Sequence, residues 1–129
     1  MITIANIKTH PKDDPNAVYV GRSLPRQRIK GSPLGNPFKF VRSGREITDP
    51  DDRAPRIEAI DRYRRWLYEE EAKMDKVWAE LRNLAERVRM GELVLLCWCH
   101  PLPCHAEVIK KRIEEIVLFG ADHIPAGHP

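Results

Sequence analysis

The stretch ELVLLCWCHPLPCHAEVIKKRIEEIV, from Glu92 to Val117, decides the fold because it reads as a buried strand, a proline-stiffened turn and an amphipathic helix. The run Val94–Leu96 is short and apolar, as the central strand of a sheet requires. We expect the helix to begin near Pro103, since proline is tolerated in a first helical turn, and apolar residues then recur at helical spacing through Val117.

The same stretch concentrates the reactive side chains of the chain. All three cysteines and two of the five histidines fall within nine consecutive positions. Strand periodicity places Cys97 and Cys99 on one face, while Cys104 and His105 fall at the helix N-terminus, where free N–H groups and the helix dipole favour negative charge. This clustering predicts a functional site.

The cysteines of this site can be interpreted as catalytic or as buried packing residues. A cysteine at a helix N-terminus beside a histidine should have a lowered pKa and act as a nucleophile, so Cys104, His105 and Cys99 are the catalytic candidates, with His100 as another base. Alternatively, Cys97 and Cys104 are packing residues, because free cysteine is among the most buried residue types.

Metal binding is a third interpretation. Cys97, Cys99, Cys104 and His105 are the ligand types that tetrahedral zinc prefers, so zinc is the one metal cofactor that the sequence suggests. A Cys-x-Cys pair within a strand is stiffer than the Cys-x2-Cys knuckle of most structural zinc sites, which argues against this interpretation in part.

Outward from this stretch, the pattern predicts strands over 2–7 and 17–21 and an irregular loop over 23–40 that is rich in glycine and proline. One helix is predicted from the aspartate cluster at 49–52 to about Glu71, and a second over 74–88 that Gly91 closes. These elements predict an α/β fold: a small three-layer sandwich with a short, mostly parallel sheet flanked by helices. We expect one domain over 1–119 and a flexible C-terminal tail over 120–129.

The irregular loop is strongly basic. From Gly21 to Arg45 there are seven basic residues and no acidic one, which suggests a local anion site. In parallel sheets ligands bind beyond the carboxyl ends of the strands, so the turn after the second strand and the cysteine turn are expected to form one pocket. The residues predicted to bind the ligand are Gly21, Arg22, Arg26, Arg28, Gly35 and Asn36.

Four segments carry a resemblance to a known family. VYVGR (18–22), SPLGNPF (32–38), RIEAIDRYRRWL (56–67) and LLCWCHPLPCHAEVI (95–109) resemble the domain of unknown function 4326 family (DUF4326), small proteins encoded by bacteria and their phages. The chain departs from the expected pattern at Ala106, where the family usually has glycine. The resemblance implies a domain identity and no established reaction.

These features together predict a domain that binds a nucleotide-like or other phosphate-bearing, anionic small molecule. If it is an enzyme, group transfer or hydrolysis on a nucleotide or nucleoside is expected, with Cys104 or His105 nearest the reacting atom. The alternative is a non-catalytic module, either a ligand sensor or a zinc-stabilised part of a phage or bacterial assembly.

The helical arginines alternate with acids, which argues against sequence-specific DNA binding. No apolar run approaches the roughly 18 residues of a membrane span, and the N-terminus lacks a signal-peptide layout, so a cytoplasmic location is expected.

Overall fold

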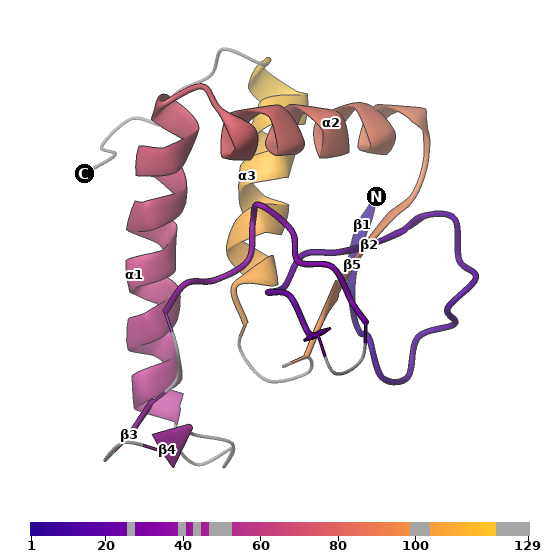
Figure 1. Cartoon of the computed structure of the whole chain (residues 1–129). Coiled ribbons are helices and arrows are strands. Elements are labelled where there is room, and N and C mark those ends of the chain that lie inside the picture. Colours follow the sequence, from indigo (N-terminus) through magenta and orange to yellow (C-terminus); the bar gives the residue numbers. More distant parts are fainter. Residues whose placement is uncertain (26–27, 39–40, 43–44, 47–52, 99–103, 121–129) are drawn as a thin grey trace.

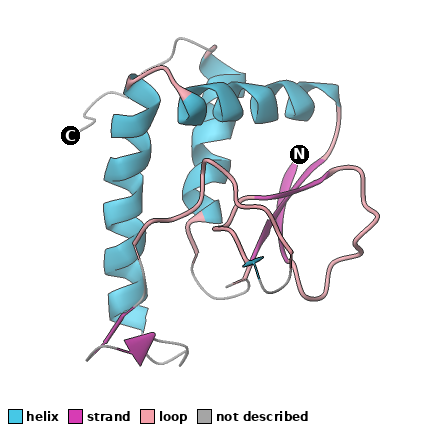
Figure 2. Ribbon diagram, viewed as in Figure 1, coloured by secondary structure: helices cyan, strands magenta, loops and turns pink. Residues whose placement is uncertain are grey.

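A computed structural model describes residues 1–25, 28–38, 41–42, 45–46, 53–98 and 104–120. Figure 1 shows the path of the chain, and Figure 2 shows the helices grouped together beside the three strands of the main sheet. The elements in chain order are β1 (Ile2–Asn6), β2 (Ala17–Tyr19), β3 (Val41–Arg42), β4 (Arg45–Glu46), α1 (Arg53–Ala72), α2 (Lys76–Met90), β5 (Leu93–Cys97) and α3 (Ala106–Phe119).

The main sheet has three parallel strands in the order β1-β5-β2. Leu95 of β5 is the register partner of Ile4 on one side and of Val18 on the other. The predicted central strand therefore occupies the centre, and the predicted α/β fold with a short parallel sheet is confirmed. The ribbon of β3 and β4 is antiparallel and separate; its two-residue strands carry too little periodicity to be predicted from sequence.

The two faces of β5 differ in burial, as its alternating side chains require. Leu93, Leu95 and Cys97 are buried, whereas Val94 and Leu96 are half-buried. The buried face joins one hydrophobic core with Ile2 and with apolar residues of all three helices. The helix side of the sheet therefore carries the core.

The helices follow the predicted apolar stripes. In α2, Val77, Leu81, Leu84 and Ala85 are buried at helical spacing, and the Gly91 N–H donates to the Val88 carbonyl at the end of the helix. α3 begins at Ala106, three residues after the predicted start at Pro103. No helix within the described part of the chain is long and apolar enough to cross a membrane.

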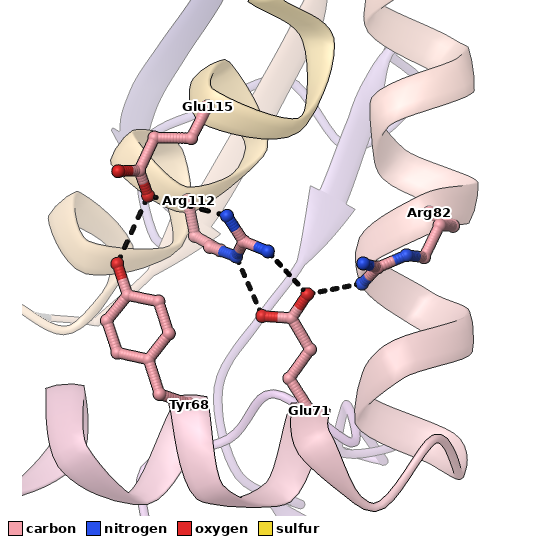
Figure 3. A network of polar contacts seen from close by, with 5 residues as sticks. All are labelled: Tyr68, Glu71, Arg82, Arg112 and Glu115. Atoms are coloured by element: carbon pink, nitrogen blue, oxygen red, sulfur yellow. Dashed lines mark hydrogen bonds and ion pairs between the residues drawn. The ribbon is translucent and has the colours of Figure 1, made fainter. Parts of the chain in front are cut away.

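Buried charges join the three helices near the C-terminal end of α1 (Figure 3). The Arg112 side chain of α3 is only 2% exposed and donates from Nε and Nη2 to the two carboxylate oxygens of Glu71 in α1, at 2.7 and 2.9 Å. Arg82 of α2 donates to the same carboxylate. We call this group, with Tyr68 and Glu115, the helix joint.

The pKa values of the helix joint follow from these contacts. Burial acts to raise the pKa of Glu71, but the hydrogen bonds from Arg112 and Arg82 outweigh it and hold the pKa below its ordinary value of 4.5. Burial and the Glu115 carboxylate raise the pKa of Tyr68 to about 12. The joint is therefore an ion cluster whose charges satisfy one another.

The described residues cover part of the predicted loop and the end of the last helix. The irregular loop holds one isolated bridge, between Leu24 and Ile29, within its described residues. α3 ends at Phe119, next to the predicted domain boundary. The helix-start cluster 49–52 and the predicted tail beyond Gly120 lie outside the described residues, and the single-domain boundary stays a prediction.

Candidate functional site

The carboxyl ends of the three parallel strands meet at one edge of the sheet, as the register requires. β1 ends at Asn6, β2 at Tyr19 and β5 at Cys97. The segments that leave these ends bring together most of the described residues that the sequence marked for function. Ligands of parallel sheets bind at such an edge.

The exit from β2 is tied to the sheet and to the basic loop. The Val20 N–H donates to the Leu96 carbonyl at 3.1 Å, and the Gly21 carbonyl accepts from the Ser32 N–H at 3.0 Å. A Cβ atom at Gly35 would lie 3.0 Å from the Gly21 oxygen, so glycine is needed for this close approach. The backbone at Gly21 and Arg22 lies beside Gly35, and the predicted ligand-binding role of Gly35 stays a prediction.

Asn36 has a structural hydrogen bond inside the loop. Its Oδ1 accepts from the Phe38 N–H at 2.8 Å, and the residue is buried. Ser32 makes a similar turn, with its Oγ accepting from the Leu34 N–H at 3.0 Å. These side chains hold the loop in its conformation. The Asn36 Oδ1 already accepts a hydrogen bond within the loop.

Tyr63 of α1 connects the loop to the start of α3. Its hydroxyl donates to the Leu34 carbonyl at 2.6 Å, and its ring lies edge-on to the His105 ring at a centroid distance of 5.0 Å. Burial, together with Cys104, raises the pKa of Tyr63 well above its ordinary value of 10.0. The hydroxyl therefore stays protonated and holds its donor role.

His105 joins the start of α3 to the end of β2. Its Nε2 lies 2.8 Å from the Val20 carbonyl oxygen, which can only accept, so Nε2 carries the proton and Nδ1 keeps a lone pair. Burial and the positive charge of Arg22 lower the pKa of His105 below its ordinary value of 6.5, although the bond to Val20 opposes them. His105 is therefore neutral at pH 7.

The thiols near this site are enclosed. Cys97 and Cys104 are buried, each only 1% exposed, and the Cys104 Sγ accepts from the Ala106 N–H at 3.2 Å. The Glu107 N–H donates to the Cys104 carbonyl, so part of the first turn of α3 is already bonded internally. The catalytic roles of Cys104 and His105 stay predictions, and Cys99 lies outside the described residues.

The metal interpretation has no geometric support in the part of the chain that is described. There, no three His, Cys, Asp or Glu side chains are grouped so that they could hold a metal ion. Cys97, Cys104 and His105 are all described, whereas Cys99, the fourth predicted ligand, is not.

Arg22 is close enough to His105 for its positive charge to lower the pKa of the imidazole. It is exposed, it follows the buried Gly21, and its carbonyl accepts from the Tyr19 hydroxyl at 2.7 Å. Arg28 is also exposed and adopts a left-handed backbone, with φ of 57°. Arg26 lies outside the described residues. We call Arg22, Leu34, Tyr63 and His105, with the Val20 carbonyl, the edge cluster.

The sequence did not reveal the polar contacts at the carboxyl end of β1. Asn6 donates from Nδ2 to the Trp98 carbonyl at 3.1 Å and accepts at Oδ1 from the Lys8 N–H at 2.8 Å. The Lys8 ammonium lies 4.7 Å from the centre of the Trp98 ring. A polar residue at the end of a predicted strand was the available signal. Tyr63 was missed as a site residue because its position in an apolar helical stripe marks it only as core.

Comparisons with known proteins identify the family of this chain. The family model described as "Domain of unknown function (DUF4326)" matches residues 5–115. No curated protein and no solved structure matches the chain.

Proposed function

Since the chain belongs to the DUF4326 family, whose description assigns no reaction, we propose its function from the edge cluster: it binds a nucleotide-like or phosphate-bearing small molecule at the carboxyl ends of β2 and β5. One observation carries this proposal. The hydrogen bond between His105 and the Val20 carbonyl holds the turn that bears Arg22 against the start of α3. Two segments 85 residues apart in sequence are thereby fixed at the edge where parallel sheets bind ligands.

The charge of the loop supports an anionic ligand. Gly21 to Arg45 contains seven basic residues and no acidic one. Arg22, Arg28 and Lys30 are exposed members of this set. An exposed arginine suits phosphate, because its guanidinium can donate two parallel hydrogen bonds to phosphate oxygens.

The enclosed thiols favour ligand binding over thiol catalysis. A nucleophilic cysteine must be reached by its substrate, and burial in apolar surroundings raises the pKa of a thiol and makes it less reactive. Cys104 is 1% exposed, and its sulfur accepts a hydrogen bond from the backbone. We therefore assign recognition to Arg22 and the surrounding backbone, and packing to Cys104.

Isothermal titration calorimetry with nucleoside mono-, di- and triphosphates and with inorganic phosphate tests the proposal. We expect at least one nucleotide to bind, and Arg22→Gln to weaken it about tenfold to a hundredfold, as expected for the loss of a charge-assisted hydrogen bond of roughly 1.5–3 kcal/mol. Arg62→Gln is the matched control, because the Arg62 side chain is 62% exposed on α1. Absence of binding across the panel, or equal losses in both variants, would refute the proposal.

Thiol labelling separates binding from thiol catalysis. With iodoacetamide at neutral pH, followed by mass spectrometry, we expect Cys97 and Cys104 to react far more slowly in the folded protein than in urea. Rapid labelling of Cys104 alone in the folded protein would instead support the nucleophile.

A further inference from the structure

The β1 end of the sheet edge carries a second cationic group that the proposed ligand site does not use. Lys8 follows β1 by two residues and is exposed, and its ammonium lies 4.7 Å from the centre of the Trp98 ring. Trp98 directly follows the central strand β5. A cation held over an indole face keeps its charge available to a further partner on its open side.

Asn6 preorganises this pair from the backbone. Its side chain donates to the Trp98 carbonyl and accepts from the Lys8 N–H, so one amide links the ends of β1 and β5. The Asn6 backbone carbonyl accepts from the Thr9 and His10 N–H groups, which closes the turn that contains Lys8. The indole Nε1 is enclosed and has no hydrogen-bond partner among the described residues.

Asp14, a carboxylate in the connection between β1 and β2, is already engaged. Asp14 accepts from the His10 ring at 2.7 Å through Oδ2 and from the Asn16 N–H at 2.9 Å through Oδ1. Its negative charge is therefore directed into its own loop, and Lys8 pairs with the Trp98 ring.

From this geometry we infer a second anion subsite, formed by Lys8 on Trp98, so that the preferred ligand carries two anionic groups. The inference rests on the proposed function, in which Arg22 binds the first group. β1 and β2 flank β5, which sets them roughly 10 Å apart, twice the usual strand spacing. Lysine and arginine side chains are long enough to span part of this separation. A nucleoside diphosphate has the required chemistry, whereas a monophosphate can engage one subsite only.

The test compares the dissociation constants of matched nucleoside mono- and diphosphates by calorimetry. We expect the wild-type protein to bind the diphosphate about tenfold more tightly. Lys8→Met, which keeps the aliphatic contact with the ring and removes the charge, should abolish this preference and leave monophosphate affinity unchanged. Lys8→Arg should retain the preference, and Lys76→Met, at an exposed lysine at the start of α2, should not alter it.

Two substitutions of Trp98 test whether its aromatic ring is needed for the preference. Trp98→Phe keeps an aromatic face and should keep the preference, whereas Trp98→Leu should reduce it. A merely structural role of Trp98 would change both affinities together and not their ratio. Equal wild-type affinities for the two ligands, or equal losses of both in Lys8→Met, would overturn the second subsite while leaving the proposed function intact. Absence of binding by either ligand would overturn both.

Discussion

Two polar clusters lie inside this small domain, and they differ in how their groups are satisfied. In the helix joint, Glu71 is shared by two arginines, so the buried charges neutralise one another. In the edge cluster, neutral Tyr63 and His105 donate to backbone carbonyls and leave the charge of Arg22 exposed. A closed ion cluster fits a stabilising role, whereas a rigid neutral frame with an exposed cation fits ligand binding.

The largest expected effect comes from opening the helix joint. Arg112→Ala leaves the buried Glu71 carboxylate with Arg82 as its remaining arginine partner, so we expect a loss of about 3–5 kcal/mol in the free energy of unfolding. Urea denaturation measures this loss. Arg62→Ala should change stability by less than about 1 kcal/mol, since its ion pair with Glu58 is exposed. Equal effects of the two substitutions would show that the joint is not a closed cluster.

A double substitution sharpens the same point. Glu71→Leu combined with Arg112→Met removes both charges while retaining side-chain volume, and the pair should lose far less stability than the two single variants predict by addition. An additive double variant would contradict direct pairing between Glu71 and Arg112.

The next effect comes from one hydroxyl of the edge cluster. Tyr63→Phe leaves the buried Leu34 carbonyl without its donor, so we expect a loss of about 1–3 kcal/mol in the free energy of unfolding, together with weaker nucleotide binding. Tyr68→Phe is the matched control from the helix joint and should leave nucleotide binding unchanged. If both variants bind nucleotide like the wild type, Tyr63 is only a core residue.

A smaller effect is expected from Gly35→Ala. The added methyl would lie 3.0–3.2 Å from the backbone of Gly21 and Arg22, which must then shift. We expect about 1 kcal/mol of destabilisation and a larger relative loss of nucleotide affinity than of stability. Gly91→Ala is strained by its backbone, with φ of 158°, but its Cβ would meet nothing within 4 Å; it should lower stability without affecting binding, as calorimetry can establish.

The most gradual effect is the response of stability to pH. The two clusters lose their contributions to the free energy of unfolding in different pH ranges. The folded pKa of His105 lies below 6.5, so the stability it contributes is complete above that pH and declines as the pH falls toward the folded pKa. The folded pKa of Glu71 lies below 4.5, so its contribution is lost only at more acidic pH. Urea denaturation from pH 7.5 to 3.5 should show both declines. His105→Gln should abolish the first alone, and an unchanged first decline would contradict the burial of a neutral imidazole.

Periodicity was sufficient to predict the frame of the fold. The apolar run of β5 and the stripes of α2 and α3 are local, and the structure contains each of them. Arg112 lies within the α3 stripe of Ile109, Ile113 and Ile116, and Glu71 continues the apolar face of α1. Charges at core-facing positions were the available sign of a buried pair.

The partners inside each cluster could not be predicted from spacing. Glu71 and Arg112 are 41 positions apart, and His105 is 85 positions from Val20, so only the tertiary fold makes them neighbours. The turn of Gly21 and Arg22 was expected to form one pocket with the turn from Cys99 to His105. The hydrogen bond between His105 and Val20 brings described residues at these two turns together, and the pocket itself stays a prediction. The enclosure of Cys97 and Cys104 was one of the alternatives that the sequence left open, because a cysteine run looks the same whether it is open or buried.

Residue-resolved NMR titration with a nucleoside monophosphate tests the assignment of ligand binding to the edge cluster most directly. We predict that the largest changes in amide chemical shift occur at 20–22, 34–36 and 104–106, with the helix joint at 68–71 and 112–115 little affected. Changes centred on the helix joint, or none at saturating nucleotide, would contradict the assignment.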